Sequence, residues 1–169
     1  MAVVLYHLWP NRLSGGFVGV DVFFVISGFL ITGHLLREID RTGSVSLTRF
    51  WAARARRLLP ASLLVLTATA VAVLVAVPRS LQERFLAEVL SSAFYVQNWK
   101  LAGDAVDYLA ADNRPSASQH FWSLSVEEQF YVFLPLLVLA AVVVARRLGV
   151  RPARVVLAVL VLVTVASFA

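Results

Sequence analysis

The chain has 169 residues, of which 60% are hydrophobic and 15% are charged. A soluble globular domain carries about 45–50% apolar and roughly 25% charged residues, so this composition excludes a globule with a water-facing surface and indicates an integral membrane protein. The net charge of +5 comes almost entirely from arginine beside apolar segments, which favours a role in membrane topology over nucleic-acid binding. The absence of cysteine excludes disulfides and thiol chemistry.

The apolar residues fall into segments of the length that crosses a bilayer, for which a helix needs about 20 residues. Polar connections separate these segments, and the chain has no internal repeat. We therefore predict an all-α fold, a polytopic bundle of transmembrane helices, and we expect both ends of the chain to be cut from a longer protein. The predicted helices cover residues 1–9 (partial), 16–36, 61–78, 85–102 (weak), 122–145 and 154–169 (partial).

The weak segment 85–102 decides the membrane topology. It mixes charged and amide side chains with aromatic ones, so it fits a tilted span, an interfacial helix or a re-entrant piece. Six arginines between residues 37 and 57 place that connection on the cytoplasmic side by the positive-inside rule, and the arginines of 146–154 favour the same side. If 85–102 crosses the membrane, however, the two connections lie on opposite sides. The sequence leaves both topologies open.

Two ionisable residues near the start of the chain are candidates for chemistry. Asp21 lies near the beginning of the apolar segment 16–36. A charged side chain at the centre of a membrane helix costs about 2.5–3.5 kcal/mol, so charged side chains in such helices usually face the interior of the bundle. A structural role as a helix cap is the alternative. His7 lies beside Tyr6 and Trp9, where it fits either a group that exchanges a proton near neutral pH or an interfacial anchor.

The stretch "RFWAARARRLLP" contains a cluster of arginines followed by Pro60. On a helix such a cluster forms a basic patch that binds phosphates. The alternative is a topology anchor beside anionic lipid headgroups. We expect Pro60 to end this polar segment and to admit the next membrane helix.

The stretch "HFWSLSVEEQFYVFLP" places two adjacent carboxylates at the edge of an apolar segment. Ser125 and Glu128 fit the S-x-x-E capping box, in which Ser125 is the N-cap and Glu128 returns to its backbone N–H. Glu127 lies about 100° further around the helix, in a polar row with Ser123 and Tyr131. We therefore expect Glu128 to cap the helix and Glu127 to face a polar cavity.

Five stretches in this order make the chain recognisable: "VVLYHLWP", "GGFVGVDVFFVISGFLIT", "RFWAARARRLLPA", "SAFYVQNW" and "HFWSLSVEEQFYVFLP". Together they resemble the N-terminal part of membrane acyltransferase family 3, the OafA/YrhL type. The resemblance implies a multi-pass enzyme of the bacterial plasma membrane that moves an acyl group, commonly acetyl from acetyl-CoA, onto a hydroxyl of a cell-envelope carbohydrate or glycoside. Some members carry a further extracytoplasmic domain downstream.

The resemblance also implies roles for matching positions. The first-helix histidine falls on His7 as the general base, and the acidic positions fall on Asp21 and Glu127 as further catalytic residues. Arg54, Arg56 and Arg57 match the basic stretch and are expected to hold the acyl-CoA donor. Ser123, Glu128 and Tyr131 are expected to support the site. The sequence itself shows no spacing of metal ligands, so we expect no metal. The arginine that the family places upstream of its histidine falls before Met1, so we expect the chain to be inactive alone.

Two other functions fit the same residues. A proton-coupled transporter or flippase would use His7, Asp21 and Glu127 as a proton relay, although broken helices and repeated halves, which are typical of transporters, are not visible. The second is an inactive, truncated membrane scaffold. Membrane lipid and a carbohydrate acceptor are the partners that the acyltransferase hypothesis predicts.

Overall fold

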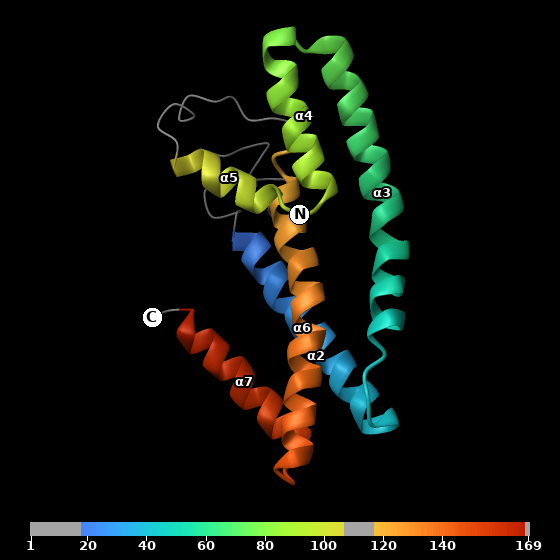
Figure 1. Cartoon of the computed structure of the whole chain (residues 1–169), viewed down its shortest axis with the longest axis vertical. Coiled ribbons are helices and arrows are strands. Elements are labelled where there is room, and N and C mark those ends of the chain that lie inside the picture. Colours follow the sequence, from blue (N-terminus) through green and yellow to red (C-terminus); the bar gives the residue numbers. More distant parts are fainter. Residues whose placement is uncertain (1–17, 107–116, 168–169) are drawn as a thin grey trace. The chain divides into compact units, whose positions relative to one another are not determined.

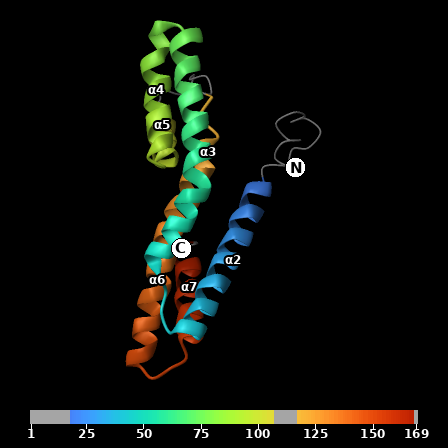
Figure 2. The ribbon, with the colours of Figure 1, turned by 90° about the vertical axis from the view of Figure 1, so that its right-hand side faces the viewer.

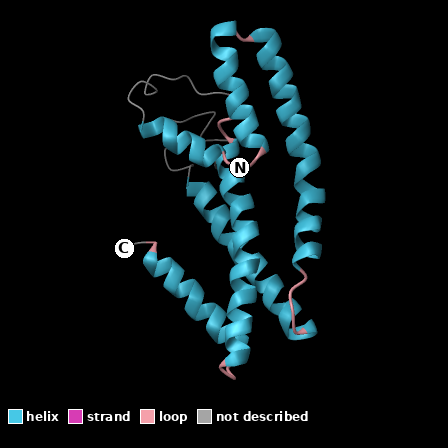
Figure 3. Cartoon of the chain, in the orientation of Figure 1, coloured by secondary structure: helices cyan, strands magenta, loops and turns pink. Residues whose placement is uncertain are grey.

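The described part of the chain is all helical. The computed structural model describes residues 18–106 and 117–167, and every regular element in these ranges is a helix (Figure 3), which confirms the predicted all-α fold there. Three of the helices are long and apolar enough to cross a membrane, so the chain is a membrane protein. In the labels of Figure 1 the helices are α2 (Val18–Thr42), α3 (Leu47–Ala76), α4 (Arg79–Ala93), α5 (Gln97–Val106), α6 (Phe121–Arg147) and α7 (Pro152–Ala166).

The chain divides into two compact units. Unit 1 contains residues 1–47 and 133–169, and its described helices are α2, the second part of α6 and α7. On α2 the buried residues recur every four positions, which is the spacing of one apolar stripe along a helix. The buried apolar side chains of unit 1 are Ile31, Leu35, Ile39, Val45, Leu134, Val138, Ala141, Val142, Ala145 and Val156.

A glycine turn ends α2 within unit 1. Gly43 has φ +75°, and its N–H donates to the carbonyl of Ile39 at 2.7 Å. The guanidinium of Arg146, near the end of α6, donates to the Gly43 carbonyl. A cation at a helix C-terminus is favourable because the last carbonyls carry partial negative charge. The C-terminal ends of α2 and α6 therefore lie together.

Unit 2 contains residues 48–132, which are nearly all of α3, then α4, α5 and the first turns of α6. α3 and α4 lie side by side as an antiparallel pair, as Figures 1 and 2 both show. The last carbonyls of a helix have no partner within that helix. At the end of α3 the amide of Gln82 supplies donors, to the carbonyl of Val77 at 2.9 Å and to that of Leu74 at 3.2 Å.

The predicted start of a helix at residue 61, after Pro60, is wrong. α3 begins at Leu47 and continues through Pro60 to Ala76. Proline lacks an N–H and so removes the hydrogen bond to the carbonyl of Arg56 four residues earlier. Helices in membranes tolerate such a residue when neighbouring groups compensate. The arginine-rich stretch and the apolar span are therefore parts of one helix.

The weak segment 85–102, which the sequence left open as a tilted span, an interfacial helix or a re-entrant piece, forms two short helices in the structure. The chain forms α4, with 15 residues, and α5, with 10 residues, and the turn 94–96 separates them. Each is shorter than the helix of about 20 residues that a bilayer requires. Neither helix by itself is long enough to cross the membrane, which favours the topology in which both arginine-rich connections lie on one side.

Candidate functional site

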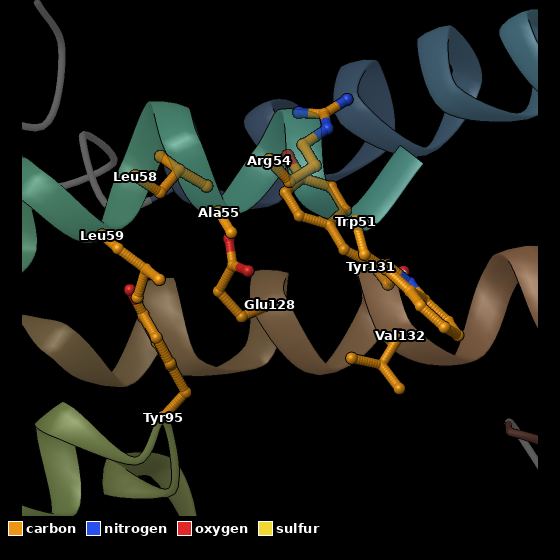
Figure 4. Close-up of a pocket in the computed structure, with 9 residues that line it drawn as sticks. All are labelled: Trp51, Arg54, Ala55, Leu58, Leu59, Tyr95, Glu128, Tyr131 and Val132. Carbon is orange, nitrogen blue, oxygen red and sulfur yellow. The ribbon is translucent and has the colours of Figure 1, made fainter. Parts of the chain in front are cut away.

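Unit 2 holds a pocket of about 170 Å³ between α3 and α6, beside the turn that joins α4 to α5 (Figure 4). A cavity of about 150 Å³ in another protein holds a benzene molecule, so this pocket has room for a small organic group. Most of its wall is apolar or aromatic, with one guanidinium and one carboxyl side chain. The lining residues are Trp51, Arg54, Ala55, Leu58, Leu59, Tyr95, Glu128, Tyr131 and Val132.

Arg54 is the cationic side chain of the pocket. Its Cζ lies 4.3 Å from the ring centroid of Tyr131 and 5.5 Å from that of Phe50. The ring quadrupole stabilises a guanidinium that lies over an aromatic face. The guanidinium still donates hydrogen bonds there, because its N–H groups lie at the edge of the guanidinium plane. Arg54 is therefore held in place by two rings and remains suited to bind an anionic or carbonyl oxygen.

The two adjacent glutamates have different environments. Glu127 is buried and accepts a hydrogen bond from the hydroxyl of Tyr131, one helical turn later. Glu128 extends from α6 towards Ala55 and lines the pocket (Figure 4). One carboxylate oxygen of Glu128 is buried and has no hydrogen-bond partner among the described residues. Such an oxygen is an acceptor for a hydroxyl or amide group of a ligand.

The predicted capping box at Ser125 is wrong. α6 begins at Phe121, four residues earlier, and the Ser125 hydroxyl donates to the carbonyl of Phe121 at 2.9 Å inside the helix. The turn before α6 starts the helix, because the N–H of Phe121 donates to the carbonyl of Ser118 at 3.0 Å. Glu128 thus lies in the second turn of α6, where the first-turn N–H groups are out of reach and its side chain is free to line the pocket.

Trp51 connects the two helices that form the pocket. Its indole N–H donates to the main-chain carbonyl of Tyr131 at 3.1 Å. In an α-helix that carbonyl accepts from the N–H four residues later, but this position is Pro135, which has no N–H. The side chain of Trp51 from α3 therefore supplies the donor that the proline removes from α6.

The other predicted site residues that the structure describes lie outside the pocket. Asp21 lies in the first turn of α2, in unit 1, and is exposed. Arg56 and Arg57 lie on α3 and are exposed, and the hydroxyl of Ser123 donates to the carbonyl of His120 at 3.3 Å. His7 lies outside the described residues. The described ranges contain no group of three or more histidine, aspartate or glutamate side chains that could hold a metal ion.

Three residues of the site were missed by the sequence reasoning: Trp51, Tyr95 and Gln129. Tyr95 lines the pocket, and Gln129 donates to the Tyr95 carbonyl at 2.8 Å. The stretch "SAFYVQNW" contains amide and aromatic groups inside a mostly apolar region, and buried amides in such a setting usually have hydrogen-bond partners. That pattern indicates that the amide side chains of this stretch form buried hydrogen bonds, but it does not identify the residues with which they form them.

Comparison with known proteins gives a consistent result. A family model described as an acyltransferase domain matches residues 1–169. The O-acetyltransferase OatA of Staphylococcus aureus is 39% identical over 140 residues, which cover 82% of this chain and 23% of that protein. YrhL of Bacillus subtilis, provisionally named a peptidoglycan O-acetyltransferase, is 40% identical over 136 residues, which cover 80% of this chain and 21% of YrhL.

The matched region is a limited part of these relatives. A further S. aureus protein, from strain COL and provisionally named an O-acetyltransferase, is 38% identical over 147 residues, or 87% of this chain and 24% of that protein. The chain thus spans about a quarter of the length of the curated relatives that it matches. No solved structure matches it significantly. The match over the whole chain, together with the ordered sequence stretches, shows that this chain belongs to the acyltransferase family.

Proposed function

We propose that this chain is part of a membrane O-acetyltransferase of the bacterial plasma membrane. The enzyme transfers an acetyl group from acyl-CoA to a hydroxyl of a cell-envelope carbohydrate. The names of OatA and YrhL support the reaction and, for YrhL, a peptidoglycan acceptor. The observation that carries the proposal is the pocket, in which the stacked guanidinium of Arg54 and an unpartnered oxygen of Glu128 line the same small volume.

His7 is the proposed general base. A neutral imidazole removes the proton from the acceptor hydroxyl as its oxygen attacks the thioester carbonyl carbon. The C–S bond then breaks, the new ester forms, and the imidazolium returns the proton to the departing thiolate of coenzyme A. A carboxylate that accepts from the imidazole orients it and stabilises its charged form, and Asp21 and Glu127 are proposed for this role.

The arginines of α3 have two proposed tasks. Arg56 and Arg57 are exposed, which suits contacts with the phosphates of the donor. Arg54 lies in the pocket, where its N–H groups suit the carbonyl oxygen that becomes negative during acyl transfer. This division keeps the three arginines in donor binding and adds transition-state stabilisation to the task of Arg54.

The test uses the full-length protein that contains this chain, in membranes, with labelled acetyl-CoA and peptidoglycan fragments as acceptor. We expect base-labile label to appear in the acceptor. Replacing His7 by alanine should lower the rate by about 10²–10⁴-fold, because proton transfer loses its base. Replacing Arg54 by alanine should lower kcat by about 10²–10³-fold if it binds the developing oxyanion.

Arg79→Ala is the matched control, since Arg79 is an exposed arginine at the start of α4 and lies outside the pocket. Its rate should equal that of the parent protein at equal membrane level. Full activity of His7→Ala would refute the assigned base, and absence of labelled product from the parent protein with every envelope acceptor tried would refute the function.

A further inference from the structure

The turn 94–96 between α4 and α5 has an unusual residue at its centre. The N–H of Val96 donates to the carbonyl of Ser91 at 2.9 Å, and that of Tyr95 to the carbonyl of Ser92 at 3.1 Å. This pair of bonds is the Schellman arrangement, in which the residue after the C-cap is left-handed and is usually glycine. Here that residue is Tyr95, with φ 55°. It is the one residue other than glycine with positive φ among the described residues.

A left-handed conformation is sterically unfavourable for a residue with a Cβ, and glycine at this position would relieve it. Such outliers persist where surrounding contacts hold them, often at functional sites. The side chain of Tyr95 makes contacts that glycine cannot make. Its hydroxyl lies 2.9 Å from the hydroxyl of Ser62 on α3, and it lines the pocket with Glu128. In Figure 4 it lies on one side of Glu128, and Tyr131 lies on the other.

Gln129, the residue after Glu128, ties this turn to α6. Its side-chain nitrogen donates to the main-chain carbonyl of Tyr95 at 2.8 Å and to the side-chain oxygen of Asn98 at 3.0 Å. Its side-chain oxygen accepts from the amide of Asn98 and the indole N–H of Trp99, both at 3.2 Å. Four hydrogen bonds therefore fix the amide of Gln129, and with it the rotation of α6 at this turn.

We propose that Gln129 and Tyr95 are positioning residues of the pocket. Gln129 binds the turn 94–96 and holds α6 in the rotation that directs the adjacent Glu128 into the pocket. Tyr95, kept left-handed by this turn, forms the pocket wall beside Glu128. The catalytic part of this inference rests on the proposed acetyltransferase function, whereas its geometric part does not.

The kinetic test compares Gln129→Met with the parent in the full-length protein, below the unfolding temperature of both. Methionine keeps the length of the side chain and removes all four hydrogen bonds. We expect kcat per folded protein to fall about 10- to 100-fold, as for a small misplacement of a reacting group, with little change in KM. Trp99→Phe removes one of the four bonds and should give a smaller fall in the same direction. Gln119→Met is the control, because Gln119 is exposed before α6.

The geometric test does not require activity. The chain has no cysteine, so Leu58→Cys with Val132→Cys places one thiol on each side of the pocket, on α3 and α6. A short bismaleimide should cross-link this pair in the parent, and with lower yield when Gln129→Met or Trp99→Phe is added. If the parent protein has no transferase activity, the proposed function fails and the cross-link alone decides the positioning role.

An unchanged cross-link yield in both variants would overturn the inference, whatever happens to kcat. So would an unchanged kcat with a lowered unfolding temperature, since that result describes a purely structural residue. A rise in KM without a fall in kcat would also contradict it, because the positioning role predicts loss in the chemical step.

Discussion

Trp51 and Pro135 form a compensating pair that determines one wall of the pocket. Without the indole N–H, the carbonyl of Tyr131 would face α3 with no helical donor, because the proline four residues later has none. A polar group left unsatisfied on removal of its partner costs about 1–3 kcal/mol. The same contact holds the backbone of Tyr131, whose ring supports Arg54. The hydrogen bond from Trp51 to the Tyr131 carbonyl thus both stabilises unit 2 and holds the ring that supports Arg54.

This pairing predicts a non-additive pair of substitutions. Trp51→Phe should lower the free energy of unfolding by about 1–3 kcal/mol, because the Tyr131 carbonyl loses its donor. In a Pro135→Ala background the helix regains an N–H at position 135, so the penalty of Trp51→Phe should shrink by about 1 kcal/mol. Chemical unfolding in detergent micelles, monitored by circular dichroism, measures both penalties. Equal penalties in the two backgrounds would show that the hydrogen bond is not what Trp51 contributes.

Part of the pocket could be predicted from residue spacing, and part could not. The row that contains Glu127 and Tyr131 is local to one helix, and the structure contains that hydrogen bond. Glu128, which was expected to cap the helix, lines the pocket instead, because α6 starts at the turn of Ser118 and not at Ser125. Contacts such as that of Trp51 with the Tyr131 carbonyl join residues 80 positions apart. Their partners follow from the packing of two helices, which no local pattern contains.

The helix ends determine how the elements of each unit meet. Gly43 ends α2 in a conformation that favours glycine, and a Cβ added there would lie 3.3 Å from a guanidinium nitrogen of Arg146. That nitrogen belongs to the side chain that donates to the Gly43 carbonyl. A larger residue at this position would therefore both strain the turn and displace the cation that caps α2.

Gly43→Ala should accordingly destabilise the protein by about 1–2 kcal/mol, the cost of a left-handed residue with a Cβ, with a further loss if Arg146 moves. Gly103→Ala is the matched control. Gly103 lies inside α5 with no atom within 4 Å of an added Cβ, so alanine there should raise stability by up to about 1 kcal/mol through helix propensity. The unfolding temperatures of the two purified variants, each compared with that of the parent, measure both effects. Equal shifts for both glycines would contradict the role given to the α2 turn.

For the helices, the sequence predicts their presence more reliably than their ends. Pro60 was expected to be a boundary, but its missing N–H removes one hydrogen bond from a 30-residue helix that otherwise continues. The break between α4 and α5 was not expected, since the left-handed residue is Tyr95 and the stretch contains neither glycine nor proline as a turn signal. The second error arises where the contacts of Tyr95 with Ser62 of α3 and Gln129 of α6 outweigh local propensity.

For the whole chain, the arrangement of unit 1 bears on membrane topology. The hydrogen bond from Arg146 to Gly43 brings the end of α6 to the end of α2. As membrane-spanning helices, α2 and α6 would therefore end on the same side of the bilayer, and the short helices α4 and α5 are each too short to add a crossing as single spans. The arginine-rich connections after α2 and after α6 then satisfy the positive-inside rule together. The conflict in the sequence came from treating 85–102 as a possible span.

This topology predicts which positions a membrane-impermeant thiol reagent reaches. Ser44, between α2 and α3, and Val150, between α6 and α7, are exposed, and Ser80 is exposed at the start of α4. In a chain that has no cysteine of its own, Ser44→Cys and Val150→Cys should react in inside-out vesicles and not in intact spheroplasts. Ser80→Cys should react in spheroplasts, because α3, Leu47–Ala76, is long and apolar enough to carry the chain across the membrane. The unsubstituted protein gives the background. Labelling of Val150→Cys from the same side as Ser80→Cys would mean that α4 and α5 cross the membrane together, and the contact between Arg146 and Gly43 could not then exist in the membrane.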